Sequence, residues 1–267
     1  MKLTQRILNR LKIIIKADLI THYVHEAEDA IFNIRKVHCV GDSHIGVFEY
    51  IANNPKKYKF SKIRFSFCKV FGATNMGLAN PNSKTEAMPI FKSYIKTFKK
   101  KDTAILLLGE VDCGFVIWYR AEKYGLSIDT QMETSLSNYQ HLILDICKIL
   151  GTNVIICSIP LPTIKDGQTI GDIANKRSSV KASQKERTDL TLKYNTYLRK
   201  FCENTNIRYL DFEHETIDPV TGMVADAFLN ETVTDHHLSD EKLAGVIYPK
   251  LKRMLENQSK ATVYTSK

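Results

Sequence analysis

The chain has 267 residues, of which 43% are apolar and 25% charged, and its formal net charge is +9. That length can bury a complete core in one domain, and the composition is typical of a globular protein rather than a disordered one. No stretch reaches the roughly 18 consecutive apolar residues that a transmembrane helix needs, so none is predicted.

The first predicted element is a basic amphipathic helix over residues 1–16, MKLTQRILNRLKIIIK, which contains no acidic residue. Its leucines and most of its isoleucines share one helical face, and its lysines and arginines share the other. Such a helix docks on its own domain or on a partner subunit, or lies on an anionic membrane surface. We therefore define residues 1–34 as an N-terminal helical extension, with docking on the domain or a partner subunit favoured and peripheral contact to the inner membrane surface as the alternative.

Five apolar runs of strand length follow, and none alternates cleanly between apolar and polar residues. They are Val37–Val40, Ile63–Phe67, Ala104–Leu108, Val154–Cys157 and Ile207–Leu210. Continuous apolar runs of this kind are typical of parallel strands that are covered on both faces.

Helical periodicity separates these runs, most clearly over residues 132–150 and 184–203. A last helix starts at Ser239-Asp240-Glu241 and is expected to kink at Pro249. The alternation predicts a three-layer α/β/α domain with a five-stranded parallel sheet over residues 35–258, followed by a polar tail over residues 259–267. The long polar connection at residues 162–182 is expected to be a lid, a binding loop or a disordered excursion.

The cysteines indicate the cellular compartment, and the basic runs bear on whether the chain binds nucleic acid. The six cysteines show no CxxC and no paired spacing, which predicts buried reduced thiols in a cytoplasmic protein, without disulfides or a zinc site. The runs Lys56-Lys57 and Lys99-Lys100-Lys101 lack interleaved aromatic residues. We therefore expect them to be solvated faces and expect no nucleic-acid partner.

Polar residues gather immediately after the predicted strands, where ligands bind in open α/β sheets. The segments are Gly41-Asp42-Ser43-His44, Gly72-Ala73-Thr74-Asn75, Gly109-Glu110-Val111-Asp112 and, before the last helix, Asp235-His236-His237. A serine that follows a strand and opens a helix can act as a nucleophile if a histidine and an acid are within reach. His237 and Asp235 can supply these two groups.

In their order and strand placement, these motifs resemble those of the SGNH (or GDSL) hydrolases, a family of α/β/α esterases and acyltransferases with a flavodoxin-like sheet. Gly41-Asp42-Ser43 matches the family's first motif, and Gly72 is similar to the glycine whose N–H binds the oxyanion. Gly109-Glu110-Val111-Asp112 matches Gly-x-Asn-Asp in part, and Asp235-His236-His237-Leu238 resembles the final Asp-x-x-His. The resemblance covers residues 35–256.

Two departures from the family pattern concern the chemistry. Val111 stands where the family has an oxyanion-binding asparagine, and Asn75, Asn80 or Asn82 could replace that donor. The acid precedes His237 by two residues instead of three, so either Asp235 or a backbone carbonyl orients the imidazole.

The resemblance implies a serine esterase in which Ser43 is the nucleophile, His237 the base and Asp235 the orienting acid. Gly72, Asn75, Glu110 and Asp112 are the expected oxyanion or substrate-binding residues. The implied substrates are O-acyl esters, such as acetyl groups on a carbohydrate, with water or a sugar hydroxyl as acceptor. No cofactor and no metal are expected.

Several residues have a second interpretation. Asp42 and His44 are expected to shape the turn, Glu110 and Asp112 either form an acid/base pair or anchor loops, and Arg187 is expected to be solvated. Asp42-Ser43-His44 also matches the Asp-x-His of metal-dependent phosphoesterases, and the acids of Gly109-Glu110-Val111-Asp112 faintly resemble their second motif, Gly-Asp-x-x-Asp, with a spacing one residue short. The later histidine motifs of those enzymes are missing. A third alternative is a non-catalytic protein that binds a glycan or a partner on the same scaffold.

Overall fold

The computed structural model describes residues 28–29, 31–168, 175, 177 and 179–256. The predicted helix of residues 1–16 and the tail of residues 259–267 lie outside the described residues, as do residues 169–174 of the long polar connection. The division of the chain at residues 34 and 258 and the role of that connection therefore stay predictions.

The centre of the fold is a five-stranded, entirely parallel sheet. Its strands are β1 (Arg35–Gly41), β2 (Ile63–Lys69), β3 (Thr103–Leu107), β4 (Val154–Cys157) and β5 (Arg208–Leu210). They pair in the order β2-β1-β3-β4-β5. All five predicted runs are therefore confirmed as strands. The chain reverses its direction of travel across the sheet between β1 and β3, and such a switch point opens a crevice at the carboxyl ends of the two strands.

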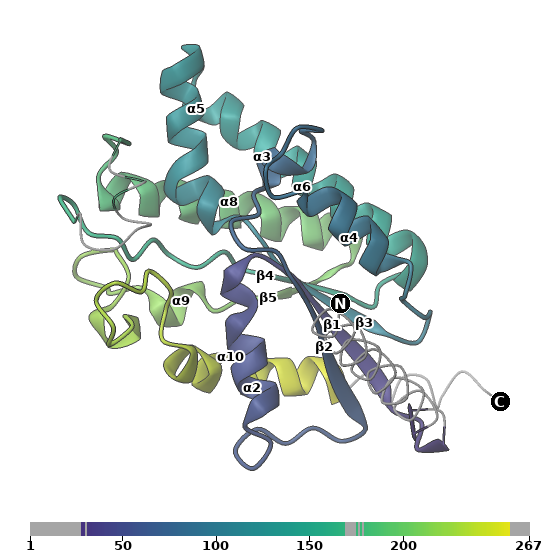
Figure 1. Cartoon of the computed structure of the whole chain (residues 1–267). Coiled ribbons are helices and arrows are strands. Elements are labelled where there is room, and N and C mark those ends of the chain that lie inside the picture. The colour runs from purple at the N-terminus through teal and green to yellow at the C-terminus, as the bar shows by residue number, and fades with distance from the viewer. Residues whose placement is uncertain (1–27, 30, 169–174, 176, 178, 257–267) are drawn as a thin grey trace, which may run out of the picture.

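Helices cover both faces of the sheet, which confirms the predicted three layers (Figure 1). One face carries α3 (Asn75–Leu78), α4 (Ala87–Ile95), α5 (Ile117–Tyr124), α6 (Ile128–Leu150) and α8 (Gln184–Thr205). The other face carries α2 (Gly46–Asn53) and α10 (Asp240–Glu256). Each side has its own apolar core, built around Tyr139 and Tyr194 on the first face and Phe48 and Phe212 on the second.

The short helices lie next to the strand ends. They are η1 (Ser43–Ile45), η2 (Asp112–Val116), α9 (Glu213–Thr216) and η3 (Asp226–Phe228). The two long helical predictions fall inside α6 and α8, and α10 continues through Pro249 to Glu256. α8 starts with a capping box in which Ser183 and Glu186 bond each other's backbone N–H, and the polar segment before it ends there.

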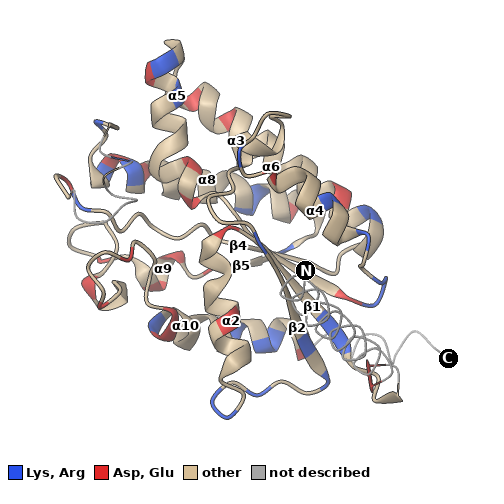
Figure 2. Ribbon diagram, in the orientation of Figure 1, with Lys and Arg blue, Asp and Glu red and all other residues tan. Residues whose placement is uncertain are grey.

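Five of the six cysteines are buried, as the sequence predicts, and Cys147 is half-buried. All six have free thiols in the described structure. Lys56, Lys57 and Lys99–Lys101 are exposed on two separate loops, and acidic and basic residues are interspersed along the outer helices (Figure 2). Within the described ranges, no helix combines the length and the apolar character that crossing a bilayer requires.

Candidate active site

Ser43 projects from a tight turn at the carboxyl end of β1. Gly41 permits this turn, because a Cβ at that position would lie 1.9 Å from the Leu107 carbonyl oxygen of β3. Asp42 caps η1: its Oδ1 accepts from the His44 backbone N–H at 2.9 Å and contacts the His44 ring Nδ1 at 2.9 Å. Asp42 therefore shapes the turn, as expected, and leaves Ser43 half-buried at the edge of the sheet.

A chain of hydrogen bonds joins Ser43 to the segment before α10. Ser43 Oγ lies 2.8 Å from Nε2 of His237, although the two residues are 194 positions apart. Nδ1 of the same ring lies 2.6 Å from Asp235 Oδ1, and that oxygen also accepts from the His237 backbone N–H at 3.0 Å. The two-residue spacing allows one carboxylate oxygen to hold both groups. Asn230 Nδ2 donates to the other oxygen of Asp235 at 3.0 Å, which fixes the carboxylate.

The protonation preferences of these groups suit a base that is neutral at pH 7. Burial lowers the pKa of His237 below its ordinary value of 6.5, and the neighbouring His44 lowers it further. Partial burial opposes ionisation of Asp235, but hydrogen bonds from His237 outweigh it and lower the carboxyl pKa. His237 can therefore accept a proton while Asp235 stays charged beside it.

A second, buried chain of charged groups runs behind Ser43. His44 Nε2 lies 3.7 Å from Glu110 Oε2, and Glu110 forms a two-pronged pair with Arg177 at 2.8 and 2.9 Å. Burial would raise the pKa of Glu110, but the Arg177 guanidinium holds it well below its ordinary range. Burial alone would lower the pKa of His44, but Asp42 and Glu110 outweigh it and leave that pKa raised. Glu110 is thus a charged carboxylate paired with Arg177. It is not free to bind a hydrogen-bond donor of a substrate, contrary to the expectation.

Asn75 and Asp112 lie in the protein interior, which differs from the expected contact with substrate. The Asn75 amide donates to the Leu108 carbonyl oxygen at 3.3 Å and to the Tyr194 hydroxyl at 3.1 Å. Asp112 accepts from the backbone N–H groups of Asn75 at 2.7 Å and Met76 at 2.9 Å. Burial raises the pKa of Asp112 to about 7. Asp112 therefore anchors the loop after β2, and the Asn75 amide is bonded to the protein interior.

The other expected oxyanion groups lie on the surface of the loop after β2. Gly72 is exposed with φ +68°, a left-handed conformation that favours glycine, and a Cβ there would meet nothing within 4 Å. Asn80 and Asn82 are exposed, and the Asn82 N–H donates to Asn80 Oδ1 at 3.0 Å. Val111 is half-buried directly before η2. The backbone N–H of Gly72 stays the proposed second donor.

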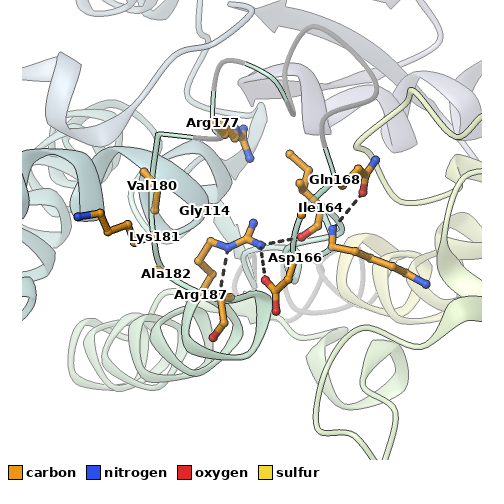
Figure 3. A pocket seen from close by; sticks show the side chains of 12 residues that line it. Gly114, Ile164, Asp166, Gln168, Arg177, Val180, Lys181, Ala182 and Arg187 are labelled. Carbon is orange, nitrogen blue, oxygen red and sulfur yellow. Dashed lines mark hydrogen bonds and ion pairs between the residues drawn. The ribbon is translucent and has the colours of Figure 1, made fainter.

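Two cavities of about 360 Å³ each are bordered by the segments that carry Arg177 and Asp235, and both are lined by Ile164, Lys165 and Gln168. One is lined also by Asp235 and His236, and so adjoins the hydrogen-bonded serine. Figure 3 shows the other, where Arg177 and Arg187 point into a space that Gly114 borders.

Arg187 is buried, contrary to the expectation that it is solvated. Its Nη2 donates to the Ile164 carbonyl oxygen at 2.7 Å, and its side chain is only 6% exposed. Asp166 lies 3.6 Å from the same Nη2. The arginine therefore holds the segment before α8 against the body of the domain.

Sequence reasoning missed Arg177 and the grouping of His44 with His236. Arg177 lies in a polar segment with no motif around it. In the sequence, the only hint of this pair is an acid, Glu110, at the end of an apolar strand, where a buried charge needs a cation. Gly114 lies against this pair, because a Cβ there would lie 2.9 Å from Glu110 Oε1 and 3.0 Å from Arg177 Nη1.

Comparison with known proteins gives a consistent result for the fold. No protein-family model and no curated protein matches the chain. A GDSL-like lipase from Bacteroides thetaiotaomicron VPI-5482 matches with a TM-score of 0.52 and 10% identity, over 82% of this chain and 89% of its own. The native aryl esterase of M. smegmatis matches with a TM-score of 0.52 and 12% identity, over 84% and 99%.

The chain has the fold of this GDSL-like lipase and this aryl esterase. In this chain, the serine turn after β1 and the histidine segment before α10 meet at the carboxyl edge of the sheet. The low identities mean that the comparisons concern the fold, while the chemistry is argued below from the residues of this chain.

Proposed function

We propose that this chain is a serine ester hydrolase or O-acyltransferase. The observation that carries the proposal is the continuous chain Ser43 Oγ–His237–Asp235, with contacts of 2.8 and 2.6 Å. Nucleophile, base and orienting acid in hydrogen-bond contact are what acyl transfer by a serine requires. The fold shared with a GDSL-like lipase and an aryl esterase supports the same reaction class.

The proposed reaction has two steps. His237 Nε2 takes the proton of Ser43 Oγ as that oxygen attacks the ester carbonyl, and the backbone N–H groups of Ser43 and Gly72 hold the oxyanion. His237 then returns the proton to the leaving alcohol, and water or a sugar hydroxyl resolves the acyl-enzyme. We propose carbohydrate O-acyl esters, such as acetyl esters, as substrates, on the motif resemblance. Without a side-chain donor at Val111, turnover is expected to be about 10²–10³ lower than with one.

A fluorophosphonate probe tests the nucleophile directly. We expect one adduct per chain by intact mass in the wild-type protein, no adduct in Ser43→Ala, and an unchanged adduct in Ser93→Ala, whose hydroxyl is exposed on α4. Acetylated sugars, with and without an acceptor sugar, then distinguish hydrolysis from transfer. An adduct that survives in Ser43→Ala would exclude the mechanism. No adduct in the wild-type protein would favour a non-catalytic binding protein or a metal-dependent phosphoesterase.

The phosphoesterase alternative has less support from the described residues. Asp42 is engaged by His44, and Asp112 by the backbone after β2. Within the described ranges, the one group close enough to share an ion consists of three histidines and includes neither carboxylate. A two-metal site on those acids is therefore not proposed.

A further inference from the structure

Three imidazole rings lie together beside Ser43: those of His44, His236 and His237. One ring nitrogen from each lies within 4.8 Å of those of the other two. The ring centroid of His237 is 4.1 Å from that of His236 and 4.6 Å from that of His44. The hydrogen-bonded serine uses only one of these rings, so the other two need a separate explanation.

Two of the rings are held as metal-binding histidines usually are. Nδ1 of His44 contacts Asp42 at 2.9 Å, and Nδ1 of His237 contacts Asp235 at 2.6 Å. A histidine that ligates a metal almost always donates its other ring N–H to a carboxylate, a carbonyl or a water. This arrangement makes Nε2 the ligand atom on both rings. The Nε2 of His44 also lies 3.7 Å from Glu110 Oε2, and the Nε2 of His237 lies 2.8 Å from Ser43 Oγ. The carboxylates of Asp42 and Asp235 also supply negative charge close to where a dication would sit.

The three ring nitrogens are farther apart than the ligands of one metal ion, but only slightly. Zinc–nitrogen bonds of about 2.0–2.1 Å place tetrahedral ligand nitrogens about 3.3 Å apart. The nitrogens here, within 4.8 Å of one another, must therefore approach by at most about 1.5 Å. His236 and His237 lie in the segment between η3 and α10 and are half-buried, and closing the site requires their rings to turn toward the buried His44.

We propose that His44, His236 and His237 bind one divalent transition-metal ion of the zinc class, for which imidazole is a preferred ligand. Coordination to Nε2 of His237 replaces the hydrogen bond from Ser43 Oγ, without any redox change. A bound ion therefore removes the base from Ser43 and inhibits it. The metal site itself does not depend on the proposed esterase function, whereas the inhibition rests on it.

Metal titration of the full chain, stripped with a chelator, tests the site. Co²⁺ is expected to give visible absorption bands typical of four-coordinate cobalt, which Zn²⁺ displaces. Ser43→Ala should bind at least as tightly as the wild-type protein, because it lacks the competing hydrogen bond to His237, and His141→Gln, a change on the exposed side of α6, should leave binding unchanged. His236→Gln, checked for folding by circular dichroism, should weaken binding at least about tenfold. Equal affinity of His236→Gln and wild type, or absence of the bands, would overturn the site.

Zinc inhibition tests the competition with Ser43. Saturating Zn²⁺ should slow fluorophosphonate labelling of the wild-type protein at least about tenfold, as expected when the base is lost. At a Zn²⁺ concentration that the titration shows to load the wild type but leave His236→Gln mostly empty, this variant should keep most of its own metal-free labelling rate. Unchanged or faster labelling of the zinc-bound wild-type protein would overturn the competition. If the wild-type protein is never labelled, the proposed function fails, while the cobalt titration still decides the metal site.

Discussion

At the scale of single residues, the site depends on environments that change ordinary side chains. His237 is a surface-segment histidine made neutral by burial and by the neighbouring His44. Asp235 orients it with a single oxygen that accepts from both the backbone and the ring. Glu110 could act as a free acid, but both of its carboxylate oxygens accept hydrogen bonds from the Arg177 guanidinium, at 2.8 and 2.9 Å. Its charge is therefore paired. The chemistry of each residue follows from its partners rather than from its type.

The pH dependence of ester hydrolysis should report the lowered pKa of His237. The base acts in its neutral form, so kcat/KM for an uncharged ester should be lost as the pH falls through a midpoint below 6.5 and be flat up to pH 8. The charged groups around this ring are His44, Asp235 and Glu110, and of these only His44 lowers the pKa. A midpoint above 6.5 would show that the carboxylates dominate instead.

At the scale of elements, close approach of β1 and β3 positions the serine turn. Gly41 pairs with Leu107, and η1 begins two residues later. A side chain at Gly41 would meet the Leu107 carbonyl at 1.9 Å and an Ile45 methyl at 2.8 Å. The glycine of the Gly-Asp-Ser motif is therefore a packing requirement between two strands, separate from any role in catalysis.

Replacement of Gly41 by alanine should destabilise the fold strongly. The added methyl group meets backbone that cannot move without separating the two strands, so we expect a loss of more than about 3 kcal/mol in the free energy of unfolding, or insoluble protein. Gly245→Ala is the matched control, because nothing lies within 4 Å of its Cβ in α10. That variant should be as stable as wild type, or more stable by about 0.5–1 kcal/mol. Urea denaturation measures both, and equal stability of the two variants would contradict the argument.

At the scale of the whole molecule, the described domain has two apolar cores on opposite faces of one sheet. Segments distant in sequence close the edge where the strands end. Glu110, just after β3, meets Arg177, 67 residues later, and Ser43 meets His237, 194 residues later. These polar links join the serine turn, the β3 end and the segments before α8 and α10 at the carboxyl edge of the sheet.

The Glu110–Arg177 pair should be costly to break and inexpensive to replace. Arg177→Met leaves the buried Glu110 carboxylate with only the longer contact, 3.7 Å, to His44 Nε2, so we expect a loss of about 3–5 kcal/mol in the free energy of unfolding. The double variant Glu110→Leu/Arg177→Met should recover most of that loss, because no charge is then left unpaired. Lys181→Met, at an exposed side chain, serves as the control. Denaturant titration measures the stability of all three variants. Wild-type stability of Arg177→Met would show that the Glu110–Arg177 pair does not stabilise the fold.

The sequence by itself determined the parallel sheet, the main helices and the motif residues Ser43, His237 and Asp235. Apolar periodicity and turn chemistry are local, and strand ends in a parallel sheet necessarily share one edge. Only the tertiary structure decided that Asn75 and Asp112 are buried, that Arg177 neutralises Glu110, and that His44 joins the two later histidines. Those outcomes depend on contacts between segments far apart in the chain, where burial and pairing, and not residue type, decide whether a polar group faces the ligand or the core.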